Sequence, residues 1–334
     1  MVELRTIGQA VVVLIGALLA AVVGGGLFVA VPLYTDVGVL EVVLALVAFG
    51  GGLFVTGRVA SNVFPGYNVA EVEVSGPITR DGGSGPLPMG RPGPGADDIV
   101  EQIERADADG NARGLVVKLN TPGGQVVPSE DIRRAAAEFD GPTVAYAEDM
   151  AASGGYWIAS GCDHFHAREE SLVGSIGVNG TQFGLTDFAD RAGIDYRRFV
   201  AGDYKDTPSS WRELSEDEEA YFQGLLDDWY DGFVETVVEG RDMDPEFVRD
   251  TEARVYVGRE AVDEGIVDTA GPREEMDEWL ADRVGVDEVT VEEFEPQAGL
   301  AGKVGMGARS VAYALGAGVT SALVGDDGEL KIRV

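Results

Sequence analysis

Two apolar runs near the start of the chain limit its fold more than any other feature. Residues 7–33 carry no charged side chain, and residues 37–57 carry only Glu41. A helix of about twenty apolar residues crosses a bilayer, so each run is long enough to do so. Both runs contain three consecutive glycines, Gly24–Gly26 and Gly50–Gly52, and small residues let two helices pack closely. The sequence therefore predicts a hairpin of two transmembrane helices.

The charges around this hairpin bear on its orientation. Arg5 precedes the first run, Arg58 follows the second, and Asp36 is the charge between them. The positive-inside rule then places both ends of the hairpin, and the domain that follows it, in the cytoplasm. One arginine on each side is weak support, so we predict a two-pass protein of the cell membrane and leave the side open. A cleaved signal peptide fits poorly because a second run follows the first. A hairpin buried in a soluble protein remains the alternative.

The charge balance argues against one class of partner. The 334 residues include 58 acidic and 25 basic side chains, for a net charge of −33, so a nucleic acid is not expected to bind. Only four of the basic residues are lysines, and the acids are spread along the chain. This composition is typical of a protein from a salt-rich cytoplasm with a hydrated acidic surface. The single cysteine, Cys162, forms no disulfide within the chain and is expected to be buried.

Two glycine-rich motifs each lie between an expected strand and an expected helix. Asn120-Thr-Pro-Gly-Gly124 follows the apolar run 114–119, and Ala152-Ser-Gly-Gly-Tyr156 follows the run 142–146. A serine on such a turn is held at a helix N-terminus, where backbone amides point at anything bonded to its oxygen. Ser153 is therefore a candidate nucleophile, although the G-x-S-x-G pattern is absent. The alternative is an ordinary helix cap.

The paired motifs N-T-P-G-G and A-S-G-G-Y resemble the signal peptide peptidase SppA family, which belongs to the wider ClpP/crotonase fold group. The segment Gly174-Ser-Ile-Gly-Val178 is also similar to that family. The resemblance covers roughly residues 69–270. It implies an α/β fold with a ClpP/crotonase-like repeated β-β-α core, here preceded by the transmembrane hairpin.

The resemblance also implies roles for individual residues. Ser153 matches the family serine that attacks the peptide carbonyl, and the family base is a lysine. The matching lysine lies in the segment 201–206, which makes Lys205 the candidate base. Ser175 corresponds to a serine that helps to position the lysine; its alternative is a turn residue. The scarcity of lysine supports a specific role for Lys205, whereas the alternative is a surface lysine on a turn.

The amides of the two motifs complete the predicted site. Gly124 and Gly154 would supply the oxyanion donors, with Gly123 and Asn120 in supporting roles. Lys205 presents a conflict, because Asp203 and Asp206 flank it and favour its charged form, while a base must be neutral. No metal or organic cofactor is implied.

The domain limits and elements follow from the apolar pattern. We predict the hairpin within 1–62, a peptidase domain over 63–285, and a strand with a Gly/Ala-rich tail over 286–334. The alternation of strands and helices predicts an α/β fold with crossovers that bring reactive groups to the strand carboxyl ends. The Gly/Pro-rich stretch 76–96 is expected to be a loop. The expected strands are 69–74, 114–119, 142–146 and 194–200, and the expected helices are 97–109, 129–139, 185–193, 215–240 and 272–284.

Two histidines bear on the choice of mechanism. His164 and His166 alternate on one short expected strand, so they share a face. No further ligand type clusters with them, and no acid is singled out to orient either ring. We therefore predict a structural pair and no metal site, and the histidines argue against a Ser-His-Asp triad.

Taken together, the sequence predicts a membrane-bound serine endopeptidase with a Ser153–Lys205 dyad. Its partners would be hydrophobic peptides such as remnant signal peptides, membrane lipid and further copies of the chain. In the family, serine and lysine can come from neighbouring subunits. The alternatives are a membrane protease of the type that cuts a stomatin-like partner, a crotonase-type acyl-CoA enzyme, and a non-catalytic membrane scaffold.

Overall fold

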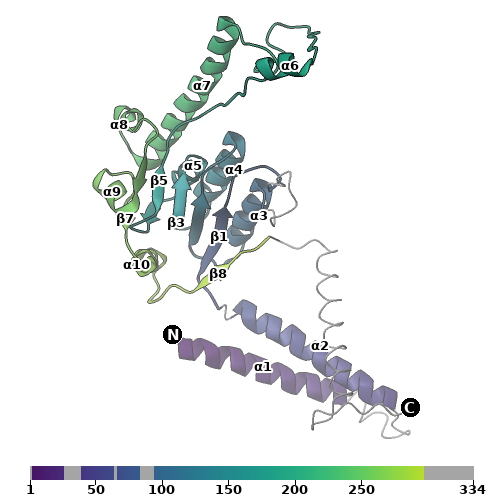
Figure 1. Ribbon diagram of the computed structural model, residues 1–334. Coiled ribbons are helices and arrows are strands. Elements are labelled where there is room, and N and C mark those ends of the chain that lie inside the picture. The colour runs from purple at the N-terminus through teal and green to yellow at the C-terminus, as the bar shows by residue number, and fades with distance from the viewer. Residues whose placement is uncertain (1, 26–38, 64–65, 83–93, 297–334) are drawn as a thin grey trace, which may run out of the picture. The chain divides into compact units, whose positions relative to one another are not determined.

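The computed structural model describes residues 2–25, 39–63, 66–82 and 94–296 (Figure 1). The description below concerns the unit that ends at Phe294. The predicted Gly/Ala-rich tail and the middle of the 76–96 loop lie outside the described residues.

The first two helices, α1 (Val2–Gly25) and α2 (Val39–Val63), pack against each other. Their glycines permit this close contact, as expected: a Cβ at Gly52 would lie 2.4 Å from the Cβ of Ala20. A Cβ at Gly24 would lie 3.2 Å from the carbonyl oxygen of Ala45. Among the described residues, no helix combines the length and hydropathy required of a membrane span. The transmembrane hairpin stays a prediction.

An eight-stranded mixed sheet organises the rest of the unit. The strand order is β6-β5-β3-β2-β1-β8, and β4 pairs with both β3 and β7. All pairings are parallel except that of β5 with β6. The predicted α/β class with a mostly parallel sheet is confirmed. The strands are β1 (Val69–Ser75), β2 (Leu115–Thr121), β3 (Thr143–Ala152), β4 (His164–Ala167), β5 (Leu172–Gly174), β6 (Val255–Val257), β7 (Thr269–Ala270) and β8 (Val291–Glu293).

Both faces of the sheet are covered, which explains the nearly continuous apolar runs of the central strands. On one face, Val116 and Val144 pack with Leu280 of α10. On the other face, Leu115 and Ala145 join the larger core, to which α3, α4, α5 and α7 contribute. The helices are α3 (Ala96–Asp107), α4 (Val126–Ala137), α5 (Gly154–Ala159), α6 (Thr186–Ala192), α7 (Glu216–Arg241), α8 (Pro245–Asp250), α9 (Gly258–Asp263) and α10 (Arg273–Val284).

Residues 178–215, which we call the arm, connect the sheet to α7 and include α6 (Figure 1). The strand predicted over 194–200 does not form, so that prediction is wrong. The segment is rich in β-branched and aromatic residues, but it pairs with no strand within the described residues. Its apolar side chains are exposed as a result, and Phe199 is 89% exposed.

The long helix α7 begins where the sequence predicts. Ser215 is its N-cap and accepts a hydrogen bond from the Glu218 amide, while the Glu218 carboxylate accepts one from the Ser215 amide. This capping box satisfies two amides at the helix start. The C-terminal half of α7 packs on the core through Phe233 and Val237, which are buried.

Candidate active site

The two glycine-rich motifs meet at one edge of the sheet. Strands β2 and β3 are parallel neighbours, so the turns after Thr121 and after Ala152 emerge side by side. The register shifts between Leu119 and Asn120, because β3 contains two additional residues there. Asn120 donates to Asp149 at this irregularity, at 3.0 Å, and is not among the residues that line the cavity described below.

Ser153 occupies a strained turn between β3 and α5. Its φ is 53° and its ψ is −114°, a conformation that a residue other than glycine rarely adopts. The Ser153 amide donates to the carbonyl of Gly174 at 2.9 Å, and its carbonyl accepts from the Trp157 amide at 2.9 Å. These two backbone bonds hold the turn, so the side chain is presented at the start of the helix in the manner of a nucleophile elbow.

The turn after β2 lies close to Ser153 and to the start of α5. Gly123 has a φ of +95°, and a Cβ there would lie 2.6 Å from the Gly154 nitrogen. The Gly123 amide is occupied by the Thr121 hydroxyl at 3.0 Å, which the sequence did not indicate. Among the hydrogen bonds of the described residues, neither the Gly124 amide nor the Gly154 amide donates to a protein acceptor. Two such donors beside a serine form the arrangement of an oxyanion hole.

A cavity of about 760 Å³ opens at this point. It is lined by Ser153, by Gly123 and Gly124 of the first motif, and by Ser175. Ser175 directly follows β5, and its φ is 54°. Apolar side chains that the sequence did not single out for the site also line the cavity: Val126, Val127, Pro128, Trp157, Trp229 and Phe233.

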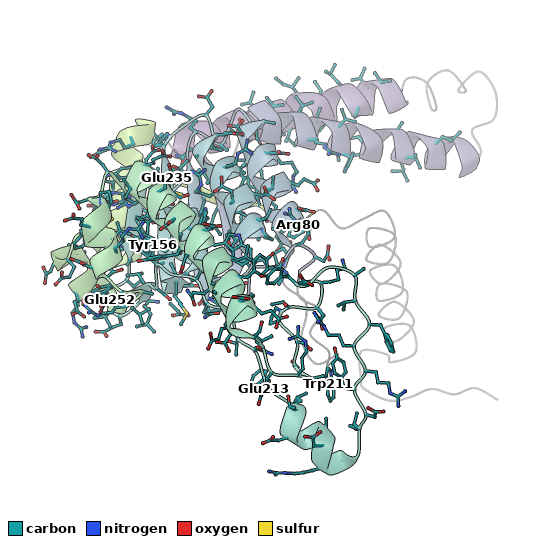
Figure 2. All side chains as sticks on the ribbon, turned by 90° about the horizontal axis from the view of Figure 1, so that it is seen from above. Arg80, Tyr156, Trp211, Glu213, Glu235 and Glu252 are labelled. Atoms are coloured by element: carbon teal, nitrogen blue, oxygen red, sulfur yellow. The ribbon has the colours of Figure 1, made fainter. Side chains whose placement is uncertain are left out.

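Lys205 is not part of this cavity within one chain. It is exposed on the arm, next to Asp206, whose carboxylate is bonded to Arg212. Arg212 also binds Glu218 in the first turn of α7. Along α7, Trp229 in the cavity wall lies eleven positions after Glu218, a span of roughly 16 Å at 1.5 Å per residue. In Figure 2, Trp211 of the arm and Tyr156 of α5 lie well apart.

Lys118 does not substitute for Lys205. It lies on β2, and its ammonium forms an ion pair with Glu148 at 3.2 Å. The hydrogen bond and charge of Glu148 outweigh burial and raise the pKa of Lys118, so the ammonium keeps its proton.

The two histidines form a buried pair on β4, as predicted. Nε2 of His164 and Nδ1 of His166 each lie 2.8 Å from the hydroxyl of Thr269. Burial lowers the pKa of His164 to about 4 and also lowers that of His166, so both rings are neutral at pH 7. Asp268 lies 3.6 Å from Nδ1 of His164, an acid that the sequence did not indicate. Neither histidine lines the Ser153 cavity.

The remaining candidates for chemistry are inert. Cys162 is buried, and burial raises the pKa of its thiol to about 12. In the part of the chain that the structure describes, no cluster of three or more potential metal ligands occurs.

A strained serine beside two donor amides is an arrangement typical of serine hydrolase sites. Residues 136–287 match Peptidase family S49. This region contains Ser153, Ser175 and Lys205.

Three relatives agree with this match. A Synechocystis protein named "Putative protease slr0021" is 35% identical over 181 residues, 53% of this chain and 65% of that protein. A Methanocaldococcus jannaschii protein named "Putative protease MJ0651" is 28% identical over 269 residues, 79% of this chain and 85% of that protein. An Enterococcus faecium protein named "Putative signal peptide peptidase SppA" is 31% identical over 201 residues, 59% of this chain and 58% of that protein.

The chain spans less than two thirds of the length of the Synechocystis and Enterococcus relatives. Its region 136–287 is similar to peptidase family S49, and the resemblance to SppA-type peptidases is confirmed.

Proposed function

We propose that this protein is a membrane-bound serine endopeptidase that cleaves hydrophobic peptides such as remnant signal peptides. Ser153 is the nucleophile, and Lys205 of a neighbouring copy is the general base. The observation that carries this proposal is the strained Ser153 turn beside the amides of Gly124 and Gly154, for which the described residues offer no hydrogen-bond acceptor. The family of the matched region supports the same chemistry.

The reaction follows from these positions. The Ser153 hydroxyl attacks the peptide carbonyl and gives its proton to the neutral Lys205 amine. The carbonyl oxygen becomes an oxyanion that accepts hydrogen bonds from the Gly124 and Gly154 amides. The lysine then protonates the leaving amine, and an ester remains on Ser153. A water molecule then attacks the ester and gives a proton to the Lys205 amine. The lysine passes a proton to the Ser153 oxygen, which releases the second product and restores the serine.

The placement of Lys205 supports a base supplied by a second copy. The lysine is exposed on the arm and absent from the cavity lining of its own chain. The arm also exposes large apolar side chains, among them Phe183, Phe188 and Phe199, which a neighbouring copy would cover. On this proposal the active site is completed only in an oligomer.

The hydrophobic lining of the cavity supports an apolar peptide as substrate. Trp157 and Phe233 pack together with ring centroids 4.5 Å apart and present aromatic surface to the cavity. We further propose that the fold has the ClpP/crotonase-like β-β-α core and that the two apolar runs anchor the protein in the membrane. Side-by-side spans would keep the active site near peptides left in the bilayer.

Labelling with a serine-reactive phosphonate, together with peptide turnover, tests the proposal. We expect the label on Ser153 and turnover that disappears in Ser153→Ala. A protein that binds acyl-CoA and takes up no label would instead be a crotonase-type enzyme. A protein with neither activity would be a scaffold, and selective cleavage of a stomatin-like partner in substrate profiling would identify the narrower protease type.

Mixing two inactive variants tests the shared site. Ser153→Ala and Lys205→Ala copies are each inactive alone, but a mixed oligomer contains sites with an intact serine and an intact lysine. We expect activity to return on mixing. Continued inactivity in mixed oligomers, shown to form by light scattering, would place both residues in one chain.

A further inference from the structure

The arm holds Lys205 beside a compact group of four charged side chains. Arg198, Asp206, Arg212 and Glu218 make this group, which we call the arm cluster. Arg198 binds the Asp206 carboxylate through Nη2 at 2.7 Å and through Nε at 3.0 Å. Arg212 bridges the two acids, with Nη2 at 3.0 Å from Asp206 and Nη1 at 2.7 Å from Glu218. Asp206 is 23% exposed and Arg212 18%, so the group is partly shielded from water.

The same contacts fix the turn that carries the lysine. Arg198 donates to the carbonyl of Asp203 at 2.7 Å, so one guanidinium holds the turn on both sides of Lys205. Glu218 in turn accepts from the Thr207 hydroxyl at 2.7 Å. The residues before and after Lys205 are therefore tied to the start of α7, whereas no ion pair involves the Lys205 ammonium itself within the described residues.

The charges within the cluster balance. Two arginines face two carboxylates, and bidentate contacts of this kind are the strongest that side chains form. The hydrogen bonds from Arg198 and Arg212 hold the pKa of Asp206 well below its usual range. The pKa of Glu218 is likewise lowered, mainly by Arg212. Both carboxylates are thus charged at any working pH, and both are already paired.

This arrangement answers the conflict in the sequence. An unpaired Asp206 next to Lys205 would stabilise the ammonium and oppose its use as a base. With Asp206 paired, the cluster presents no net charge to the lysine. The other ionisable groups around the turn are Asp203 of the turn itself, the hydroxyl of Tyr196, which donates to Asp206 at 3.4 Å, and the ring of Tyr204, packed on Tyr221.

We propose that the arm cluster positions Lys205: it fixes the turn that presents the lysine, and it pairs the Asp206 carboxylate with arginines so that the cluster adds no net charge next to the lysine. This inference rests on the proposed role of Lys205 as general base. The four cluster residues are positioning residues, since they act through the lysine and not on the substrate.

Two substitutions with opposite charge effects test the electrostatic part. Asp206→Asn leaves the cluster with one positive charge in excess, and Arg212→Gln leaves one negative charge in excess. The acid limb of the pH–rate profile should move to lower pH in Asp206→Asn and to higher pH in Arg212→Gln. Each shift should be at least a few tenths of a pH unit, as expected for one partly shielded charge near the lysine. Disruption of structure alone would not give opposite shifts.

Arg212→Lys separates position from charge. It keeps the positive charge but cannot bind both carboxylates with one planar group. We expect the acid limb to stay near its original pH while kcat falls several-fold. A pH shift as large as that of Arg212→Gln would overturn the positional part of the proposal.

Matched controls lie on the same arm. Arg197 and Asp195 form an exposed ion pair at 2.7 Å that does not touch the cluster. Arg197→Gln and Asp195→Asn change the net charge by the same amounts and should leave the limb unmoved. All variants are compared at one salt concentration, with light scattering to confirm that the oligomer is intact. Shifts in the controls equal to those in the cluster variants would overturn the proposal.

Lys205→Arg separates failure of this inference from failure of the proposed function. Activity in Lys205→Arg would show that Lys205 is not the general base, and the inference would fail together with that role. An inactive Lys205→Arg, combined with cluster variants whose limbs do not move in opposite directions, would overturn the inference alone.

Discussion

The Ser153 turn and the arm hold their functional residues by different means. At the turn, backbone groups hold the site: Ser153 forms backbone hydrogen bonds with Gly174 and Trp157, and the neighbouring amides come from glycines. On the arm, side-chain ion pairs hold the site: Arg198 and Arg212 bind the segment that carries Lys205. The first region is packed on the core, and the second is largely exposed.

This difference has consequences for robustness. A site built from backbone depends on space and on unusual dihedral angles, and it is insensitive to pH and salt. A segment held by charged side chains depends on the protonation of its carboxylates, on ionic strength and, on our proposal, on a neighbouring copy. Steric changes should therefore disable the turn, whereas changes of ionic strength should act on the arm.

The largest expected effect is a steric change at the turn. A Cβ at Gly124 would lie 2.1 Å from the carbonyl oxygen of Ile78, so the backbone must shift even in Gly124→Ala. Displacing the Gly124 amide should lower turnover by roughly a hundredfold to a thousandfold, the loss typical of one oxyanion donor. Gly124→Val should be at least as severe. Peptide hydrolysis measures the effect.

Gly110→Ala is the matched control, because a Cβ there meets nothing within 4 Å. We expect it to keep full activity. Circular dichroism must show Gly124→Ala to be folded. A folded Gly124→Ala variant with normal turnover would remove this loop from the mechanism.

Lowering the pH should destabilise the core around His164 before it affects the arm cluster. Burial lowers the pKa of His164 from 6.5 to about 4, so between these values the unfolded chain binds a proton that the native fold excludes. Stability should fall as pH drops through this window, by up to roughly 3 kcal/mol for His164. The pKa values of Asp206 and Glu218 are lowered, so their contribution is present above the ordinary carboxyl range and is lost only below about pH 4. The arm cluster should persist while the core weakens.

Denaturant midpoints between pH 7 and pH 4 measure this loss. His164→Gln removes the titrating ring and should flatten the pH dependence. An unchanged slope in that variant would show that other groups cause the acid sensitivity.

The same contrast explains what the sequence could predict. The Ser153 turn and the oxyanion amides follow from glycines and a serine placed after apolar strands, because parallel strands end at one edge of a sheet. The bond of Trp157 to Glu130 follows from no such pattern, since it joins two helices through the packed fold. The strand expected over 194–200 failed because β-forming residues need a neighbouring strand, and the segment pairs with none among the described residues. The arm cluster was missed because ion pairs depend on three-dimensional placement, which the two aspartates beside Lys205 did not reveal.

Dilute buffer should act on the arm before it acts on the turn. The chain carries a net charge of −33, and the screening length grows from about 3 Å in 1 M salt to about 30 Å in 0.01 M salt. Repulsion between copies should then separate the oligomer and lower turnover at least tenfold, while the sheet stays folded. Sedimentation, circular dichroism and peptide hydrolysis measured across a salt series provide the readout. Full activity with an unchanged sedimentation profile in dilute buffer would contradict this expectation.

The smallest expected effect concerns the strain at Ser153. Its φ of 53° costs energy for any residue with a Cβ, typically about 1–3 kcal/mol, and glycine avoids that cost. Glycine also loses about 0.5–1 kcal/mol through its greater freedom in the unfolded chain. Ser153→Gly should therefore be inactive yet roughly 1 kcal/mol more stable than Ser153→Ala, which keeps the strain. On the arm, Ser210 has no positive φ, so Ser210→Gly should be less stable than Ser210→Ala. Denaturant midpoints of the four variants decide the matter. Equal stability of Ser153→Gly and Ser153→Ala would mean that the turn stores no strain. The turn and the arm would then differ only in the groups that hold them, backbone amides in one and charged side chains in the other.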